Sequence, residues 1–172
     1  MVPGVMVAAM CLALSGAARA ADPVSDAKAT KEVFLKTDPD LQRFFDESPG
    51  YVIFPSIGKG GVGIGGAHGN GILFARGDHP VARASMTQVS VGLQLGGQNF
   101  SEIIFFENEK AFSDFKKGNF SLTAGVSAVA LAAGASKSAK YQKGVAVFTA
   151  TKGGLMFEAS VGGQRFSISA LK

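Results

Sequence analysis

Lysines beside glycine pairs are the residues of this sequence best placed to bind a ligand. Lys59 precedes Gly60-Gly61, and Lys152 precedes Gly153-Gly154. Exposed backbone amides at such turns, together with an ammonium group, form a site that suits an anion. A lysine at a turn also has a simpler use, because its charge keeps the turn in water. The pattern leaves both interpretations open, an anion-binding site and a solvated turn.

The other residues that could do chemistry match no catalytic or nucleotide-binding pattern. The run Gly61–Gly66 has the form G-x-G-x-x-G, but a turn signal follows it where a dinucleotide site needs a helix. No Gly-Lys-Ser/Thr completes a phosphate loop, and no serine lies in G-x-S-x-G. The two histidines, His68 and His79, lack a spacing typical of metal ligands. We expect no enzyme activity, no cofactor and no metal.

Two helices are expected ahead of the glycine-rich part of the chain. Residues 22–48 contain no glycine, and the apolar residues between Pro23 and Lys36 fall near one face of a helix. Asp38 followed by Pro39 is typical of the start of a second helix, which Ser48-Pro49-Gly50 ends. The first helix is amphipathic, so it suits either a membrane interface or packing on a sheet. Its candidate membrane-contact residues are Lys28, Lys31, Phe34 and Lys36.

The rest of the chain is expected to form mainly β-strands. Tyr51–Phe54 predicts a short strand that ends at Pro55. The run His68–Gly71 signals a turn, and Ile72–Arg76 predicts the strand that returns from it. Ile103–Phe106 is a continuous apolar run that predicts a central strand.

Further along, Asn108 is expected to cap a short internal helix that ends at Gly118. No long crossover helix is predicted, which favours antiparallel pairing. Strands with one face of glycine allow a sheet to curve sharply. The expected fold is therefore α+β, a strongly curved antiparallel sheet or partly closed barrel, covered by the N-terminal helices and the internal helix.

The first twenty residues are expected to be a signal peptide. The apolar run from Val5 to Gly16 is shorter than the roughly 20 residues that span a membrane, and Ala18-Arg19-Ala20 is typical of a cleavage site. We expect cleavage after Ala20, a single mature domain over residues 21–172, and a periplasmic or secreted protein. The only cysteine, Cys11, lies in the removed part, so the mature domain has no disulfide.

Charge excludes one class of partner. The chain has 17 basic and 13 acidic residues and a formal net charge of +4, of which cleavage would remove Arg19. Its lysines are scattered along the chain, so the pattern of a nucleic-acid-binding surface is missing. A mild positive charge permits attraction to an anionic membrane surface.

Several glycine-rich stretches taken together resemble the SYLF domain family, and the resemblance covers about residues 25–172. The stretches that carry it are Tyr51–Gly66, Gly69-Asn70-Gly71, Ser90–Gln98, Lys152–Leu155 and Val161-Gly162-Gly163. The resemblance implies phospholipid binding and, in some members of the family, actin binding. This chain has no tryptophan, where eukaryotic members have one before the proline that corresponds to Pro80. That difference and the expected export argue against actin as a partner.

The resemblance and the residues together give a binding hypothesis. We expect a non-enzymatic periplasmic domain that binds anionic phospholipid or a membrane surface. Basic side chains would meet the head groups, and apolar side chains would contact the acyl chains. The candidate residues are Lys59, Lys152 and Arg76 for the head groups and Phe54, Ile57, Phe148 and Phe157 for the chains. The alternative is an envelope structural or protein-interaction module without a lipid ligand.

Overall fold

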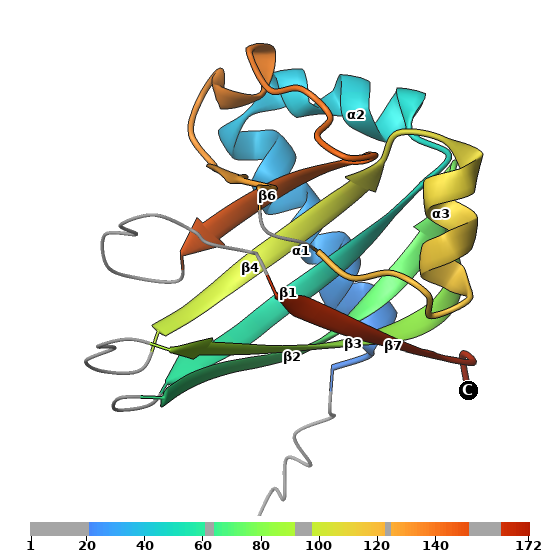
Figure 1. The fold of residues 1–172 in the computed structure, drawn as a ribbon. Coiled ribbons are helices and arrows are strands. Elements are labelled where there is room, and N and C mark those ends of the chain that lie inside the picture. The colour runs from blue at the N-terminus through green and yellow to red at the C-terminus, as the bar shows by residue number, and fades with distance from the viewer. Residues whose placement is uncertain (1–20, 61–63, 92–97, 123–124, 152–162) are drawn as a thin grey trace, which may run out of the picture.

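A seven-stranded sheet forms the centre of the protein, in the order β5-β6-β4-β1-β2-β3-β7 (Figure 1). The computed structural model describes residues 21–60, 64–91, 98–122, 125–151 and 163–172. The strands are β1 Gly50–Gly60, β2 Ile64–Ala75, β3 His79–Val91, β4 Gln98–Phe106, β5 Ala128–Ala130, β6 Val145–Thr151 and β7 Gln164–Ser169. The helices are α1 Pro23–Thr37, α2 Gln42–Glu47 and α3 Glu109–Lys116, with 3-10 turns η1 Pro39–Leu41 and η2 Ala135–Lys137.

The α+β class is confirmed, but the sheet is neither purely antiparallel nor closed. Strand β5 runs parallel to β6, whereas the other neighbouring strands are antiparallel. The outermost strands, β5 and β7, do not pair with each other. Instead, the chain after α3 joins the two edges: Ser121 bridges to Arg165 of β7, and β5 then joins β6. This crossing segment takes the place of the strand pairing that would close a barrel.

The two faces of the sheet carry separate hydrophobic cores. Because side chains alternate along a strand, Phe105 packs with Phe44 and Phe45 of α2, while Phe106 packs with Phe115 of α3. We call the face that carries α1 and α2 the outer face and the face under α3 the inner face. Figure 1 shows α1 behind the sheet, crossing β1 and β2. The inner core also holds side chains of the crossing segment, namely Phe120, Leu122, Val126 and Ala128.

The predicted helices are confirmed, but the cap expected at Asp38 is not. A 3-10 turn precedes α2, and the carboxylate of Asp38 accepts hydrogen bonds from the N–H groups of Gly134 and Ser136 instead. Helix α1 has Pro23 at its start and buries Ala27 and Phe34. The Oδ1 atom of Asn108 accepts a hydrogen bond from the N–H of Ala111 at 2.9 Å, which caps α3. Gly118 follows α3 with a φ of +77°, a conformation that glycine adopts easily.

Two strand predictions are wrong in the same region. Strand β1 does not end at Pro55 but continues to Gly60 through a register shift at that residue. Proline has no N–H to donate, so an irregular position in the ladder accommodates it. The run His68–Gly71 is not a turn but lies inside β2. Its glycines serve close packing instead: a β-carbon on Gly71 would stand 2.4 Å from the carbonyl oxygen of Ile53.

Candidate functional site

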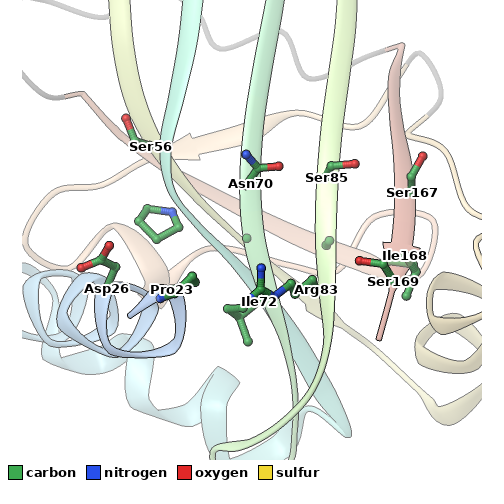
Figure 2. Close-up of a pocket in the computed structure, with 13 residues that line it drawn as sticks. Pro23, Asp26, Ser56, Asn70, Ile72, Arg83, Ser85, Ser167, Ile168 and Ser169 are labelled. Carbon is green, nitrogen blue, oxygen red and sulfur yellow. The ribbon is translucent and has the colours of Figure 1, made fainter. Parts of the chain in front are cut away.

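The outer face of the sheet is polar beyond the part that α1 covers. Ser56 of β1 lies opposite Asn70 of β2, Asn70 opposite Ser85 of β3, and Ser85 opposite Ser167 of β7. Directly opposed residues on neighbouring strands point to the same side of a sheet, about 5 Å apart. Figure 2 shows this row of hydroxyl and amide groups running across four strands.

The row forms one wall of a groove of about 660 Å³ on the outer face. Helix α1 borders the groove with Pro23 and Asp26, and β7 borders its other side (Figure 2). Arg83 of β3 lies in the groove, opposite Ile72 on one side and Ser169 on the other. The full lining is Pro23, Asp26, Pro55, Ser56, Asn70, Gly71, Ile72, Arg83, Ala84, Ser85, Ser167, Ile168 and Ser169. Hydroxyls, an amide and a guanidinium make this groove suited to an anionic polar ligand.

Arg83 is available to a ligand, whereas two other arginines are committed to the fold. Within the described residues, Arg83 makes no hydrogen bond or ion pair. The guanidinium of Arg43 donates to the carbonyl oxygens of Ser136 and Ala139 at 2.7 and 3.0 Å. That of Arg76 donates to the carbonyl of Glu47 at 3.0 Å and, more weakly, to that of Ser48. Arg83 therefore keeps its donors free for a carboxylate or phosphate.

A second row of polar residues extends the same surface toward the other end of the strands. His68 of β2 lies opposite Thr87 of β3, which lies opposite Arg165 of β7. All three side chains are exposed. Two arginines and a histidine thus share the outer face with uncharged polar groups, and Asp26 at the rim is the acidic residue that lines the groove.

The ionisable groups with shifted pKa values lie away from this groove. Burial raises the pKa of Tyr51, and so does the hydrogen bond that its hydroxyl donates to Asp78. Burial alone would raise the pKa of Asp78, but hydrogen bonds from Lys31 and Tyr51 outweigh it and hold that pKa below its usual value. Burial raises the pKa of Glu102 to about 7.

The predicted apolar contact residues are core residues. Phe54 and Ile57 are fully buried in the inner core, and Phe148 is fully buried in the outer core. They come to lie there because β1 and β6 are interior strands of the sheet, covered on both faces. The expected apolar surface at these side chains is therefore not present, and lipid contact with them would require the core to open.

The predicted basic residues are divided between the fold and the undescribed parts of the chain. Arg76 caps the end of α2, as described above. Lys59 lies in β1 opposite Ala67 and Gln98, but its side chain is outside the described structure. Lys152 and Phe157 lie outside the described residues. The anion-binding interpretation of the two glycine turns stays a prediction.

The predicted membrane-contact helix uses its apolar face for packing on the sheet. Phe34 is fully buried, and the ammonium of Lys31 pairs with Asp78 at 2.6 Å and lies 4.4 Å from the ring centre of Phe45. Lys28 and Lys36 remain exposed. Of the two roles open to this helix, the structure supports packing.

The groove with Arg83 was missed by the sequence analysis, although a signal for it exists. From Arg83 to Thr87 in β3, polar residues alternate with the buried residues Ala84 and Met86. Such alternation is typical of a strand with one solvated face. What the sequence does not reveal is that the solvated faces of β1, β2, β3 and β7 align into one row.

The described residues lack two features, a cluster of metal ligands and a membrane-spanning helix. No three histidine, cysteine or acidic side chains come together there as metal ligands. None of the helices in the described ranges is both long enough and apolar enough to cross a membrane.

Comparison with known proteins connects the chain to one family. Residues 87–170 match the model of the Ysc84 family, described as "Las17-binding protein actin regulator". The chain is also 26% identical over 130 residues to "Beta cell expansion factor A" of Aeromonas veronii. That match covers 76% of the chain and 49% of the relative, so the chain spans about half the length of that protein. The matched family region includes β4, β6 and β7 and begins at Thr87, shortly after Arg83.

Proposed function

We propose that this protein is a non-enzymatic module that binds anionic phospholipid. The proposal starts from the match of residues 87–170 to the Ysc84 (SYLF) family. Family membership supports a lipid- or actin-related module. The choice of phospholipid, and of the periplasm or the outside of the cell as the place of action, is our proposal. It rests on the export signal expected in residues 1–20, since actin is not expected in a bacterial envelope.

One observation carries the choice of an anionic ligand: the free guanidinium of Arg83 lies in a groove lined by hydroxyl groups. Ser85 and Ser167 lie within one strand spacing of each other in that groove. A phosphate oxygen placed beside Arg83 would accept hydrogen bonds from the guanidinium and from such hydroxyls. A neutral or cationic ligand would leave the guanidinium without a charged partner.

On the outer face, the strands that the helices leave uncovered carry basic side chains, although α1 and α2 on the same face also expose acidic residues such as Asp26 and Glu32. Arg165 and His68 extend from the same side of the sheet as Arg83. Charges spread over an exposed face act together on a surface of opposite sign, and salt screens this attraction over about 10 Å at 0.1 M. Binding to an anionic bilayer is therefore expected to weaken as salt is raised.

Flotation with lipid vesicles tests the proposal. The purified protein is mixed with vesicles of phosphatidylglycerol and phosphatidylcholine, or of phosphatidylcholine alone, each at low and moderate salt. We expect the protein to float with the phosphatidylglycerol vesicles, more at low salt than at moderate salt, and to remain behind with phosphatidylcholine alone. Failure to float with the anionic vesicles at both salt concentrations would refute the proposal.

A second candidate function is protein binding, because the description of the matched family names a protein partner. Strand β7 lies at an edge of the sheet, and edge strands can pair with another chain. Recovery of one stoichiometric protein partner from an envelope extract, without lipid and without vesicle flotation, would favour this candidate over the first.

A further inference from the structure

A second groove, of about 450 Å³, lies on the outer face on the other side of α1. Helix α1 forms one wall, and strands β1, β4 and β6 form the floor. The groove is lined by Asp26, Ala29, Thr30, Val33, Phe34, Pro55, Ser56, Ser101, Ala150 and Thr151. It thus runs along the contact between the helix and the sheet.

The surface of this second groove is more apolar than its residue names suggest. The hydroxyl of Thr30 donates to the carbonyl of Asp26 at 2.9 Å, and that of Ser101 donates to the carbonyl of Pro55 at 2.8 Å. With these hydroxyl protons already bound, both side chains present mainly carbon. Val33, at the rim, is 57% exposed, and no other large apolar side chain in the described part of the chain is so accessible. An apolar occupant would cover it favourably.

The two grooves meet. Asp26, Pro55 and Ser56 line both of them. The meeting point is the irregular position of β1, where the pairing register shifts on both sides of the strand. A polar groove with a free guanidinium therefore continues into an apolar groove along the helix.

We propose that the joined grooves bind one phospholipid molecule, with its phosphate at Arg83 and one acyl chain in the groove beside Val33. This inference rests on the proposed lipid-binding function and adds the position, the orientation and the stoichiometry of the ligand. It makes the protein a binder of single lipid molecules as well as of lipid surfaces.

Charge at the junction sets the direction in which the lipid lies. Asp26 at the junction would repel a phosphate but accepts hydrogen bonds from hydroxyl groups. Arg83 lies on β3, two strands away from β1. The phosphate therefore belongs at Arg83, and the uncharged glycerol belongs at the junction, ahead of the acyl chain.

Titration with a soluble single-chain lipid tests this arrangement. The probe is lysophosphatidylglycerol at concentrations where it is monomeric, and native mass spectrometry counts the bound molecules. We expect one molecule per protein. Across probes of increasing chain length, affinity should rise about fourfold for each methylene that the groove covers and then level off once the groove is full.

Two variants on helix α1 test where the acyl chain of the lipid binds. Ala29→Phe places a ring in the apolar groove, whereas Ser25→Phe adds the same ring at an exposed position of α1 that lines neither groove. We expect Ala29→Phe to weaken binding of lysophosphatidylglycerol about tenfold or more, which corresponds to about two covered methylenes or more, and Ser25→Phe to leave it unchanged. Both residues are exposed, and circular dichroism checks that both variants remain folded.

The outcomes separate this inference from the proposed function. Binding of one lipid in the joined grooves would be refuted by vesicle flotation without binding of the monomeric lipid. Equal binding of that lipid by Ala29→Phe and Ser25→Phe would refute it too. Either result would leave the proposed function in place. Failure of both vesicle and monomer binding would overturn both. One bound molecule, lost in Ala29→Phe alone, would establish the inference.

Discussion

Glu102 is the most unusual residue of the inner core. Its carboxyl group is fully buried, and its Oε2 accepts a hydrogen bond from Nε2 of Gln164 at 3.0 Å. Among the described residues, its other oxygen has no hydrogen-bond partner, and the same holds for Oγ1 of Thr149, the residue opposite it in β6. An ionised carboxylate is costly in such surroundings, which explains why burial raises the pKa of Glu102 to about 7.

Stability should therefore depend on pH through Glu102. Its pKa rises from 4.5 to about 7 on folding, so the folded state holds the proton more tightly and stability falls as pH rises through this interval. We expect the free energy of unfolding to be about 2–3 kcal/mol larger at pH 5 than at pH 8. Urea unfolding at both pH values measures this difference.

The variant Glu102→Gln is the control for this pH dependence. It cannot titrate, and its amide oxygen can still accept the bond from Gln164. We expect it to lose most of the difference between pH 5 and pH 8 and to be more stable than the wild type at pH 8. Asp38 and Asp78 do not interfere, because their pKa values are lowered and they affect stability only in more acidic solution. An unchanged pH profile in Glu102→Gln would show that another group causes it.

Lys31 shows how a residue predicted for membrane contact can serve the fold instead. Its side chain is only 12% exposed and pairs with Asp78, which also accepts the hydroxyl proton of Tyr51. The contact joins α1 to the turn between β2 and β3. The charge of Lys31 is therefore neutralised within the protein.

Two lysine variants on α1 separate these roles. We expect Lys31→Gln to lower the free energy of unfolding by about 1 kcal/mol, because it removes a hydrogen-bonded ion pair whose lysine side chain is 12% exposed, while solvent screens Asp78, whose side chain is 44% exposed. Lys36→Gln removes the same charge at an exposed position and should change stability by no more than about 0.5 kcal/mol. Denaturant unfolding measures both, and equal losses in the two variants would contradict a structural role for Lys31.

At the scale of elements, the glycines of β2 let β1 and its core side chains come close. A β-carbon on Gly71 would stand 2.7 Å from the ring of Phe54, and one on Gly69 would stand 2.6 Å from Ile57. Gly66, on the opposite side of β2, has more room: within the described part of the chain, the nearest atom to its β-carbon would be the carbonyl oxygen of Gln88, 3.6 Å away. The glycines of one strand thus have different importance.

This difference predicts the effect of alanine substitutions. Gly71→Ala forces atoms apart in a packed core and should cost about 2–3 kcal/mol of unfolding free energy. Gly66→Ala brings its β-carbon no closer than 3.6 Å to any described atom and should be neutral within about 1 kcal/mol. Thermal unfolding of both variants gives the comparison, and a well-tolerated Gly71→Ala would mean that the close approach is not required.

The elements that could be predicted are those whose signals are local. The cap at Asn108, the glycine after α3 and the apolar run at Ile103–Phe106 each depend on neighbouring residues, and each prediction is confirmed. The error at His68–Gly71 has a nonlocal cause, because Gly69 and Gly71 are needed for close packing against residues of another strand, β1. A sequence pattern cannot distinguish a glycine needed for a turn from one needed for close packing.

At the scale of the whole molecule, the same limit explains why the site was missed. Ser56, Asn70, Ser85 and Ser167 lie far apart in the sequence and align only through the register of four strands. The aromatic residues chosen for lipid contact, such as Phe54 and Phe148, are the ones that the sheet needs for its two cores. Their hydrophobicity indicates that these side chains avoid water. It does not indicate whether a lipid or the core of the protein covers them.

Export is a prediction about the whole chain. We expect the mature protein to begin at Ala21 and to lack Cys11 and Arg19. Intact mass measurement of the protein from an envelope fraction checks this. A mass that includes residues 1–20 would contradict cleavage after Ala20.

Binding of the anionic head group in the groove with Arg83 is tested by comparing the vesicle affinities of two variants. Arg83→Gln and Lys116→Gln each remove one positive charge, the first in the groove and the second at an exposed position of α3. We expect Arg83→Gln to weaken binding to phosphatidylglycerol vesicles about fivefold to tenfold, as expected for about 1 kcal/mol of lost charge-assisted contact, and Lys116→Gln to change it by less than about twofold. Equal affinity of the two variants would show that the head group does not bind at Arg83.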